Sequence, residues 1–144
     1  MKEENELLLY IYQDSKMATE SLITLLENIK NKDNKIKGLV EEILKEYEKY
    51  LKKSKKRLSK EKIKLKEKNI FINMGASFGI KKIIAKDNSD SRIADMLIKG
   101  LSMGSIDIEK KLSDFKDTDR QILNLAKKLK QFQETKIEEL KKYL

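Results

Sequence analysis

Apolar residues recur every three or four positions along most of this chain, and no proline interrupts them. One such stripe runs through Ile36, Val40, Ile43, Tyr47, Tyr50, Ser54 and Leu58. This spacing puts side chains on one face of an α-helix, and proline is the residue that most strongly disrupts a helix interior. Because 40% of the residues are charged and only five are glycine, the sequence predicts nearly continuous helix with short connections.

Two glycines four residues apart lie in the predicted helical stretch 91–115. Gly100 and Gly104 fall in the stripe that also contains Ile93 and Ile108. Each glycine costs a helix about 1 kcal/mol relative to alanine, so a close contact with a neighbouring helix must compensate for the pair. We therefore expect both glycines to face inward at a tight helix crossing.

Polar clusters divide the chain into hairpins. The short break at 31–34 implies that the helices on either side of it are antiparallel neighbours. We expect one hairpin over 3–57, a second over 91–143, and a partly helical crossover over 59–88 that joins them within a single domain, 1–144. The candidate helix N-caps are Asp33 or Asn34, a residue of 86–91, and Asp117 or Thr118, while Ser59 resembles a helix restart.

The sequence contains no cysteine and no histidine. Their absence excludes disulfides, zinc fingers, haem ligation by histidine, and every catalytic relay that uses histidine or a cysteine nucleophile. No stretch approaches the roughly 18 apolar residues of a membrane span, and the acidic start of the chain lacks the basic region of a signal peptide. We therefore expect a cytoplasmic protein that is not an enzyme and holds no cofactor.

Positive charge is concentrated between Lys49 and Lys68. This stretch holds eleven lysines or arginines against Glu61 and Glu67, an excess equal to the formal net charge of +9 of the whole chain. Such a patch can attract nucleic acid, anionic lipid or an acidic protein, although a solvated helix end has the same composition. The candidate anion-binding residues are Lys52, Lys53, Lys55, Lys56, Arg57, Lys60, Lys62 and Lys64.

Among the large apolar residues of the predicted crossover, Phe71, Met74 and Phe78 lie in a stretch that is rich in small residues. One apolar face of a crossover helix can remain free and form a symmetric dimer contact, it can simply cover the bundle, or it can meet a membrane surface with the help of Lys81, Lys82 and Lys86. We name these three residues as a possible interface.

Several polar side chains lie on the apolar stripes. Buried polar groups need hydrogen-bond partners, so these residues either form a hydrogen-bonded network or line a small-ligand pocket beside the two glycines. The candidates for close packing or a small pocket are Gly100, Gly104, Tyr12, Gln13 and Tyr47, with Ser15, Tyr50 and Gln133 as further inward polar positions.

Two hairpins joined by a long link between the second and third helices resemble the ferritin-like four-helix bundle. The metal-binding members of that family use glutamates and Glu-x-x-His pairs from their four helices. This chain has no histidine, and the residues three positions after Glu46 and Glu109 are Lys49 and Leu112. The resemblance therefore implies an all-α four-helix bundle of ferritin-like topology without the usual metal site.

Short motifs distributed over nearly the whole chain are also similar to a family of small helical bacterial proteins of unassigned activity. They are Tyr12-Gln13-Asp14-Ser15, Asp87-x-Ser89-x-Ser91-x-Ile93-Ala94 followed by Gly100-x-x-x-Gly104, and the closing Leu-Lys-Lys-Tyr-Leu at 140–144. This second resemblance implies a helical bundle and no particular reaction.

Together these observations favour a non-catalytic, homodimeric or partner-binding scaffold. The alternative is binding of an anionic polymer or surface, such as nucleic acid or anionic lipid, through the basic segment 49–68. A third possibility is a degenerate ferritin-like metal or redox protein that uses carboxylates alone.

Overall fold

The structure, a computed structural model, describes residues 3–63, 80, 82–116 and 118–144. These residues are almost entirely helical and include no strand, which confirms the all-α prediction over the described ranges. The long helices are α1 (Glu3–Ile29), α2 (Lys37–Lys60), α4 (Asp90–Asp114) and α5 (Arg120–Leu140), and α5 is followed by the short 3-10 helix η2 (Lys141–Tyr143). In the predicted crossover, residues 80 and 82–86 are helical as well.

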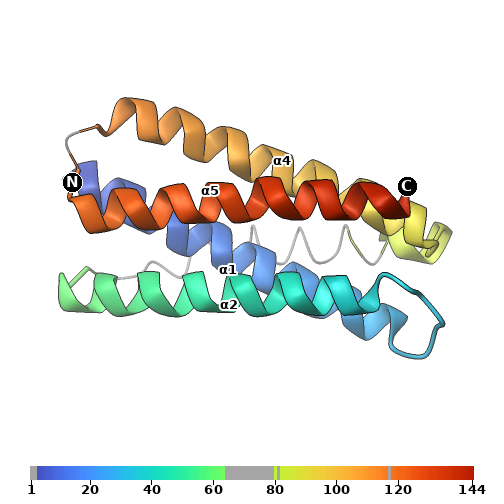
Figure 1. The fold of residues 1–144 in the computed structure, drawn as a ribbon. Helices are drawn as coiled ribbons and strands as arrows, with labels where there is room; N and C mark the ends of the chain where they lie inside the picture. Colours follow the sequence, from blue (N-terminus) through green and yellow to red (C-terminus); the bar gives the residue numbers. More distant parts are fainter. Residues whose placement is uncertain (1–2, 64–79, 81, 117) are drawn as a thin grey trace.

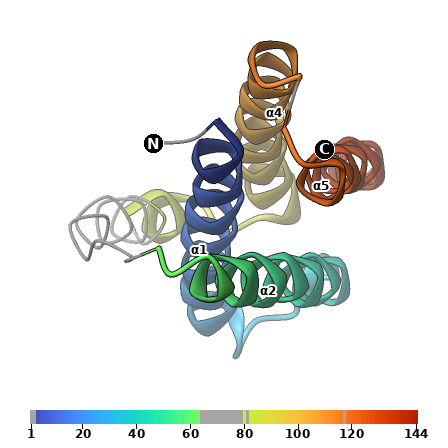
Figure 2. The same ribbon diagram turned by 90° about the vertical axis from the view of Figure 1, so that its left-hand side faces the viewer.

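The long helices pack as two antiparallel pairs, α1 with α2 and α4 with α5. Figure 1 shows α1 and α5 running in one direction and α2 and α4 in the other, with α1 oblique to α2. The end-on view in Figure 2 places α1 between α2 and α4, with α5 on one side of it. The two pairs contact each other less extensively, mainly where α5 meets α1 and α2.

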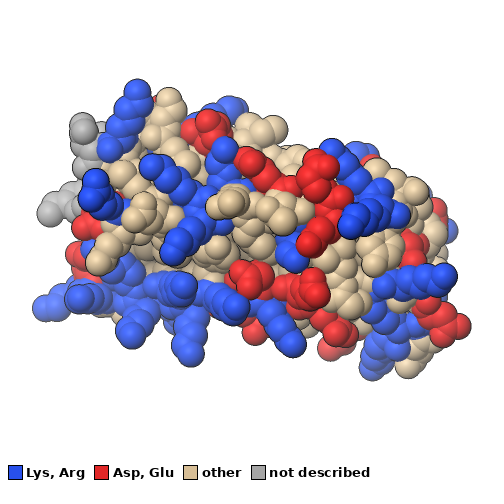
Figure 3. Space-filling model, viewed as in Figure 1, with Lys and Arg blue, Asp and Glu red and all other residues tan. Residues whose placement is uncertain are grey.

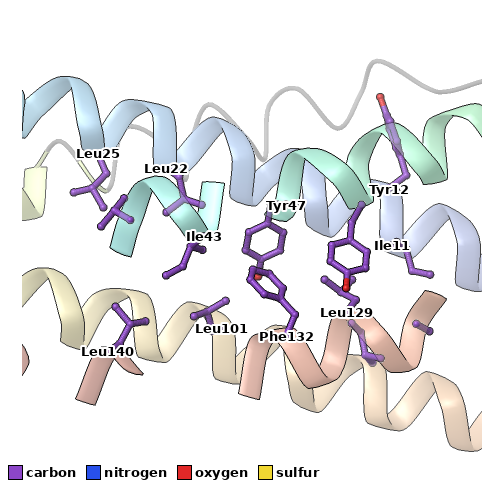
Figure 4. Close-up of a cluster of buried hydrophobic side chains, with 14 of the residues drawn as sticks. Ile11, Tyr12, Leu22, Leu25, Ile43, Tyr47, Leu101, Leu129, Phe132 and Leu140 are labelled. Atoms are coloured by element: carbon purple, nitrogen blue, oxygen red, sulfur yellow. The ribbon is translucent and has the colours of Figure 1, made fainter. Parts of the chain in front are cut away.

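The core is formed by the predicted stripes. Every residue of the stripe from Ile36 to Leu58 is buried, so the helical spacing of α2 is confirmed position by position. In Figure 4 the rings of Tyr47 on α2 and Phe132 on α5 point toward each other across the interior. Their centroids are 5.1 Å apart in an edge-to-face arrangement, a geometry that favours aromatic pairs beyond their buried area.

The predicted N-caps of α2 are wrong, because neither Asp33 nor Asn34 caps it. Its N-cap is Ile36, which makes no side-chain capping bond. The Asn34 amide instead donates to the Asn88 carbonyl and to Asp90 Oδ1, both at 2.8 Å, so it joins the first hairpin turn to the start of α4. The cap of α4 does lie within the predicted cluster, since Ser89 Oγ accepts from the backbone N–H of Arg92.

The cap of α5 is Asp119, so the predicted Asp117 or Thr118 is not the N-cap. Asp119 Oδ1 accepts from the backbone N–H groups of Gln121 and Ile122, which are the unpaired donors of the first turn. The Thr118 hydroxyl is buried and has no partner among the described residues.

Ser59 does not restart a helix, because α2 continues through it to Lys60 and extends past the predicted hairpin boundary at 57. The backbone N–H groups of Lys62 and Ile63 donate to the carbonyls of Ser59 and Leu58, which is the Schellman arrangement for a helix C-terminus. Lys62 has a φ of 58°, the left-handed conformation that such an ending requires.

Candidate functional site

A polar junction lies where all four long helices meet. Gln133 on α5 is fully buried, and its Nε2 atom donates to Asp14 Oδ2 on α1 at 3.0 Å and to Tyr47 Oη on α2 at 3.1 Å. Gly104 on α4 completes the junction, because a Cβ atom at this position would lie 2.6 Å from Gln133 Nε2. Gly104 is therefore buried at a close approach, as predicted.

The junction holds a carboxylate without a cationic partner among the described residues. Burial raises the pKa of Asp14 to about 6; the hydrogen bond from Gln133 opposes this rise and the charge of Asp107 adds to it. Burial, and then the charge of Asp14, raise the pKa of Tyr47 well above its ordinary value. Both shifts favour the neutral forms of these groups inside the fold.

Gly100 does not belong to the junction, and the prediction that it faces inward is wrong. It is exposed, and a Cβ atom there would meet no described atom within 4 Å. The buried face of α4 is centred on residues such as Leu101, Gly104 and Ile108. At about 100° per residue, Gly100 lies at the edge of that face rather than within it.

Of the other predicted pocket residues, only some lie at the junction. Tyr47 joins the junction, whereas Tyr12 points away from Tyr47 in Figure 4, and Lys16 Nζ lies 6.0 Å from its ring centroid. Gln13 is half-buried and makes no side-chain hydrogen bond with another described residue. Ser15 is buried, and its hydroxyl, like Gln133 Oε1, has no partner among the described residues.

The sequence analysis did not single out three residues at or beside the junction: Asp14, Tyr10 and Asp107. The hydroxyl of Tyr10 on α1 donates to Asp107 Oδ2 on α4 at 3.4 Å. Asp14 lies three positions after Ile11 and directly before Ser15, so helical spacing alone places it beside the buried face. That signal is weak, because an aspartate at the edge of a stripe is usually solvated.

A shallow hollow of about 470 Å³ lies between α4 and α5, on the outside of the pair. Lys130 Nζ occupies it and pairs with Glu109 at 2.8 Å and with Glu134 at 2.9 Å. These contacts raise the pKa of Lys130 and neutralise the charges of the hollow. The hollow therefore holds an ion-pair network centred on Lys130.

The surface of α2 is divided by charge. Exposed glutamates 41, 42 and 48 lie on its N-terminal part, and Figure 3 shows acidic side chains there and basic ones over its C-terminal half. We call the exposed lysines of that C-terminal half the basic face: Lys49, Lys52, Lys53, Lys55, Lys56 and Lys60.

The basic face differs from the other helices in the density of its cations. Elsewhere some lysines, such as Lys99, Lys136 and Lys141, pair with a carboxylate three or four residues away, and other exposed lysines, such as Lys30, Lys110 and Lys128, are dispersed. Of the basic face, only Lys49 forms an ion pair within the described part of the chain, with Glu46 at 3.0 Å. Three and four residues away along the helix, the lysines of the basic face have mostly other cations as neighbours.

Arg57, a candidate anion-binding residue, is engaged in contacts within the protein. Its guanidinium pairs with Glu61 and Asp119 and donates to Gln121 Oε1 at 2.8 Å. These contacts join the end of α2 to the start of α5. Lys62 is exposed, as an anion-binding residue must be.

Four predicted site residues lie outside the described part of the chain. They are Lys64 of the basic segment and Phe71, Met74 and Phe78 of the possible interface. Within the described ranges, no three acidic side chains come together in a way that could hold a metal ion. No helix there has both the length and the apolar character needed to cross a membrane.

Fold and site together define an all-α protein with a polar interior junction and one strongly basic helix face. No family model matches the sequence, and searches among curated proteins and among solved structures return no match.

Proposed function

We propose that the chain is a non-catalytic helical protein that binds an anionic polymer or surface through the basic face of α2. The observation that carries this proposal is the density of exposed lysines on one face of α2: six lie among the twelve residues 49–60, and five of them have no ion-pair partner among the described residues. Lys53, Lys55, Lys56 and Lys60 have no acidic residue three or four positions away on either side.

Crowding of like charges on a helix has a cost. Like-charged side chains at i,i+4 destabilise a helix by about 0.2–0.5 kcal/mol per pair. The basic face contains several such pairs, among them Lys49 with Lys53, Lys52 with Lys56, and Lys56 with Lys60. A bound polyanion relieves this repulsion, so the same charges that destabilise the free protein favour its complex.

The helix dipole accounts for part of the charge distribution on α2. Cations near a helix C-terminus and acids near its N-terminus are stabilising, but this effect falls off within one turn. The helix dipole therefore accounts for the position of Lys60, at the end of α2. It does not account for Lys49, Lys52 or Lys53, which lie more than one turn away from that end. The greater part of the basic face is left without a role in the stability of the helix.

Elution from immobilised heparin, a sulfated polymer, tests the proposal. The face variant carries Lys52, Lys53, Lys55 and Lys56 each changed to Gln. The remote variant carries the same number of changes at exposed lysines elsewhere: Lys30, Lys35, Lys110 and Lys142. We expect the face variant to elute at a much lower salt concentration than the wild type. The remote variant should elute at a salt concentration close to that of the wild type. Equal elution of the two variants would contradict the proposal, since both lose four positive charges.

A second candidate function is self-association or the binding of another protein as a scaffold. On α4, Met103 and Ile106 are 68% and 55% exposed, and the neighbouring Gly100 presents no side chain. Exposed apolar residues beside a glycine give a second helix room for close approach. Molar mass measured by light scattering at two ionic strengths tests this: we expect a dimer at tens of micromolar protein, and a monomer at both ionic strengths would reject it.

We also propose the finer fold assignment, a ferritin-like four-helix bundle of bacterial, cytoplasmic type. The directions of α1, α2, α4 and α5 support it, because a link from α2 to the parallel α4 must run the length of the bundle. A metal or redox role that relies on carboxylates alone ranks below both binding functions; elemental analysis of protein purified without chelator tests it.

A further inference from the structure

We infer that the partner of the basic face is duplex nucleic acid, held by its phosphate backbone without recognition of base sequence. This inference rests on the proposed function and narrows it to one class of polyanion. Four features of the described residues carry it: the band of lysines on α2, a further exposed lysine on α5, the position of the aromatic residues, and the position of the exposed apolar residues.

The six lysines of the basic face form a band along α2 that spans about 160° around the helix, at 100° per residue. Lys49 and Lys60 are eleven residues apart on α2, which corresponds to about 16 Å along the helix axis. Duplex DNA carries one negative charge per ~1.7 Å of its axis, so a row of this length can contact several phosphates. The exposed glutamates 41, 42 and 48 on the other part of α2 limit the contact to the C-terminal half.

One exposed lysine of α5 lies on the same side of that helix as its contact with α2. Gln121 on α5 contacts Arg57 on α2, and Lys128, which is exposed, follows seven residues later on the same side of α5.

The aromatic residues of α2 are not available for stacking with bases. Proteins that bind single strands stack successive bases on exposed aromatic rings. Tyr47 and Tyr50 are buried against Phe132, at centroid distances of 5.1 and 5.8 Å. Arg57, the one fork-shaped donor in the row, is held by Asp119 and Gln121. What remains is lysine, which contacts phosphate as a point charge and carries no base recognition.

The basic face also lacks an apolar element that could enter a membrane. Helices that lie on a bilayer combine a cationic face with large apolar side chains buried among the lipids. The exposed large apolar residues of the described chain are Ile23, Met103, Ile106 and Leu144, and none of them is on α2. Lysines alone attract anionic lipid by charge, with about 1 kcal/mol for each lysine near the surface, and without insertion into the bilayer.

Fluorescence anisotropy with five labelled probes tests the inference. The probes are two 20-base-pair DNA duplexes of unrelated sequence, a 20-nucleotide oligo(dT), polyglutamate, and vesicles containing 30 mol% phosphatidylserine. At 50 mM salt we expect both duplexes to bind with equal, micromolar affinity and more tightly than the other three probes. With four or five phosphates contacted, affinity should fall roughly 200-fold between 50 and 200 mM salt.

The variants defined above separate the possible outcomes. The face variant should bind duplex at least about 30-fold more weakly at 50 mM salt and with a much smaller salt dependence, whereas the remote variant should change less than about 3-fold. If oligo(dT), polyglutamate or vesicles bind more tightly than duplex and depend on the face lysines, the inference is overturned while the proposed function stands. If the two variants bind every probe equally, both fail. Thermal melting checks folding, and the double variant Lys53→Gln/Lys56→Gln replaces the face variant if that one unfolds.

Discussion

Two glycines four residues apart on α4 have opposite surroundings in the structure. Gly104 faces Gln133 and Asp14 in the interior, whereas Gly100 faces solvent. Periodicity could not separate them, because a glycine has no side chain whose polarity would report its face. The difference depends on Gln133, which is far away in the sequence and fills the space that a side chain at 104 would need.

The glycine pair gives a matched test at the residue scale. Gly100→Ala should stabilise the protein by about 1 kcal/mol, since alanine favours the helix and meets no neighbour. Gly104→Ala should destabilise it by about 1–2 kcal/mol despite the same helical gain, because the new methyl group displaces a buried amide that makes two hydrogen bonds. Urea denaturation measures both. Equal effects of the two changes would show that Gly104 is not at a close contact.

Asp14 predicts a pH dependence of stability. The pKa of Asp14 is raised to about 6 in the fold from an ordinary value of 3.8. Its contribution to the free energy of unfolding is therefore fully present below about pH 4 and is lost as the pH rises through 6. Asp14→Asn keeps an acceptor for Gln133 and removes the charge, while Tyr10, Tyr47 and Asp107 around it stay unchanged. The variant should be more stable than wild type by about 3 kcal/mol at pH 7.5 and nearly equal to it at pH 4. A stability difference that does not vary with pH would contradict this.

At the scale of elements, the parts that could be predicted are those that depend on local sequence. The buried stripe of α2 was predicted residue by residue, because period and hydrophobicity agree along it. The junction was found only in part, since the burial of Asp14 depends on α5, a helix more than a hundred residues away. The caps of α2 and α5 were missed because several polar residues in each turn could serve, and tertiary contacts such as Asn34 with Asp90 decide among them.

The end of α2 gives a test at this scale. Lys62 adopts a left-handed conformation that costs a residue with a side chain about 1 kcal/mol and that glycine adopts freely. Lys62→Gly should therefore stabilise the protein by about 1 kcal/mol in urea denaturation. Lys60→Gly, two residues earlier and still helical, serves as the control and should destabilise it. A loss of stability in Lys62→Gly would mean that the Schellman ending is not formed.

At the scale of the whole molecule, charge and packing are separated. The polar junction holds the two helix pairs together from inside, and the basic face lies on the outer side of one helix of the first pair. No buried residue of the junction belongs to the basic face, so changes on that surface should alter binding while leaving the core intact. This separation is what allows a binding surface to carry a charge distribution that the free fold does not need.

The central claim is that the basic face is kept for binding at a cost in stability, and Lys53→Glu tests it most directly. Lys53 has the cations Lys49, Lys56 and Arg57 at helical spacing, so the change turns three repulsive pairs into attractive ones. We predict that its melting temperature rises by about 3 °C while its elution salt on heparin falls, with Lys30→Glu as the charge-matched control. A melting temperature that falls, or retention that matches the control, would contradict the account.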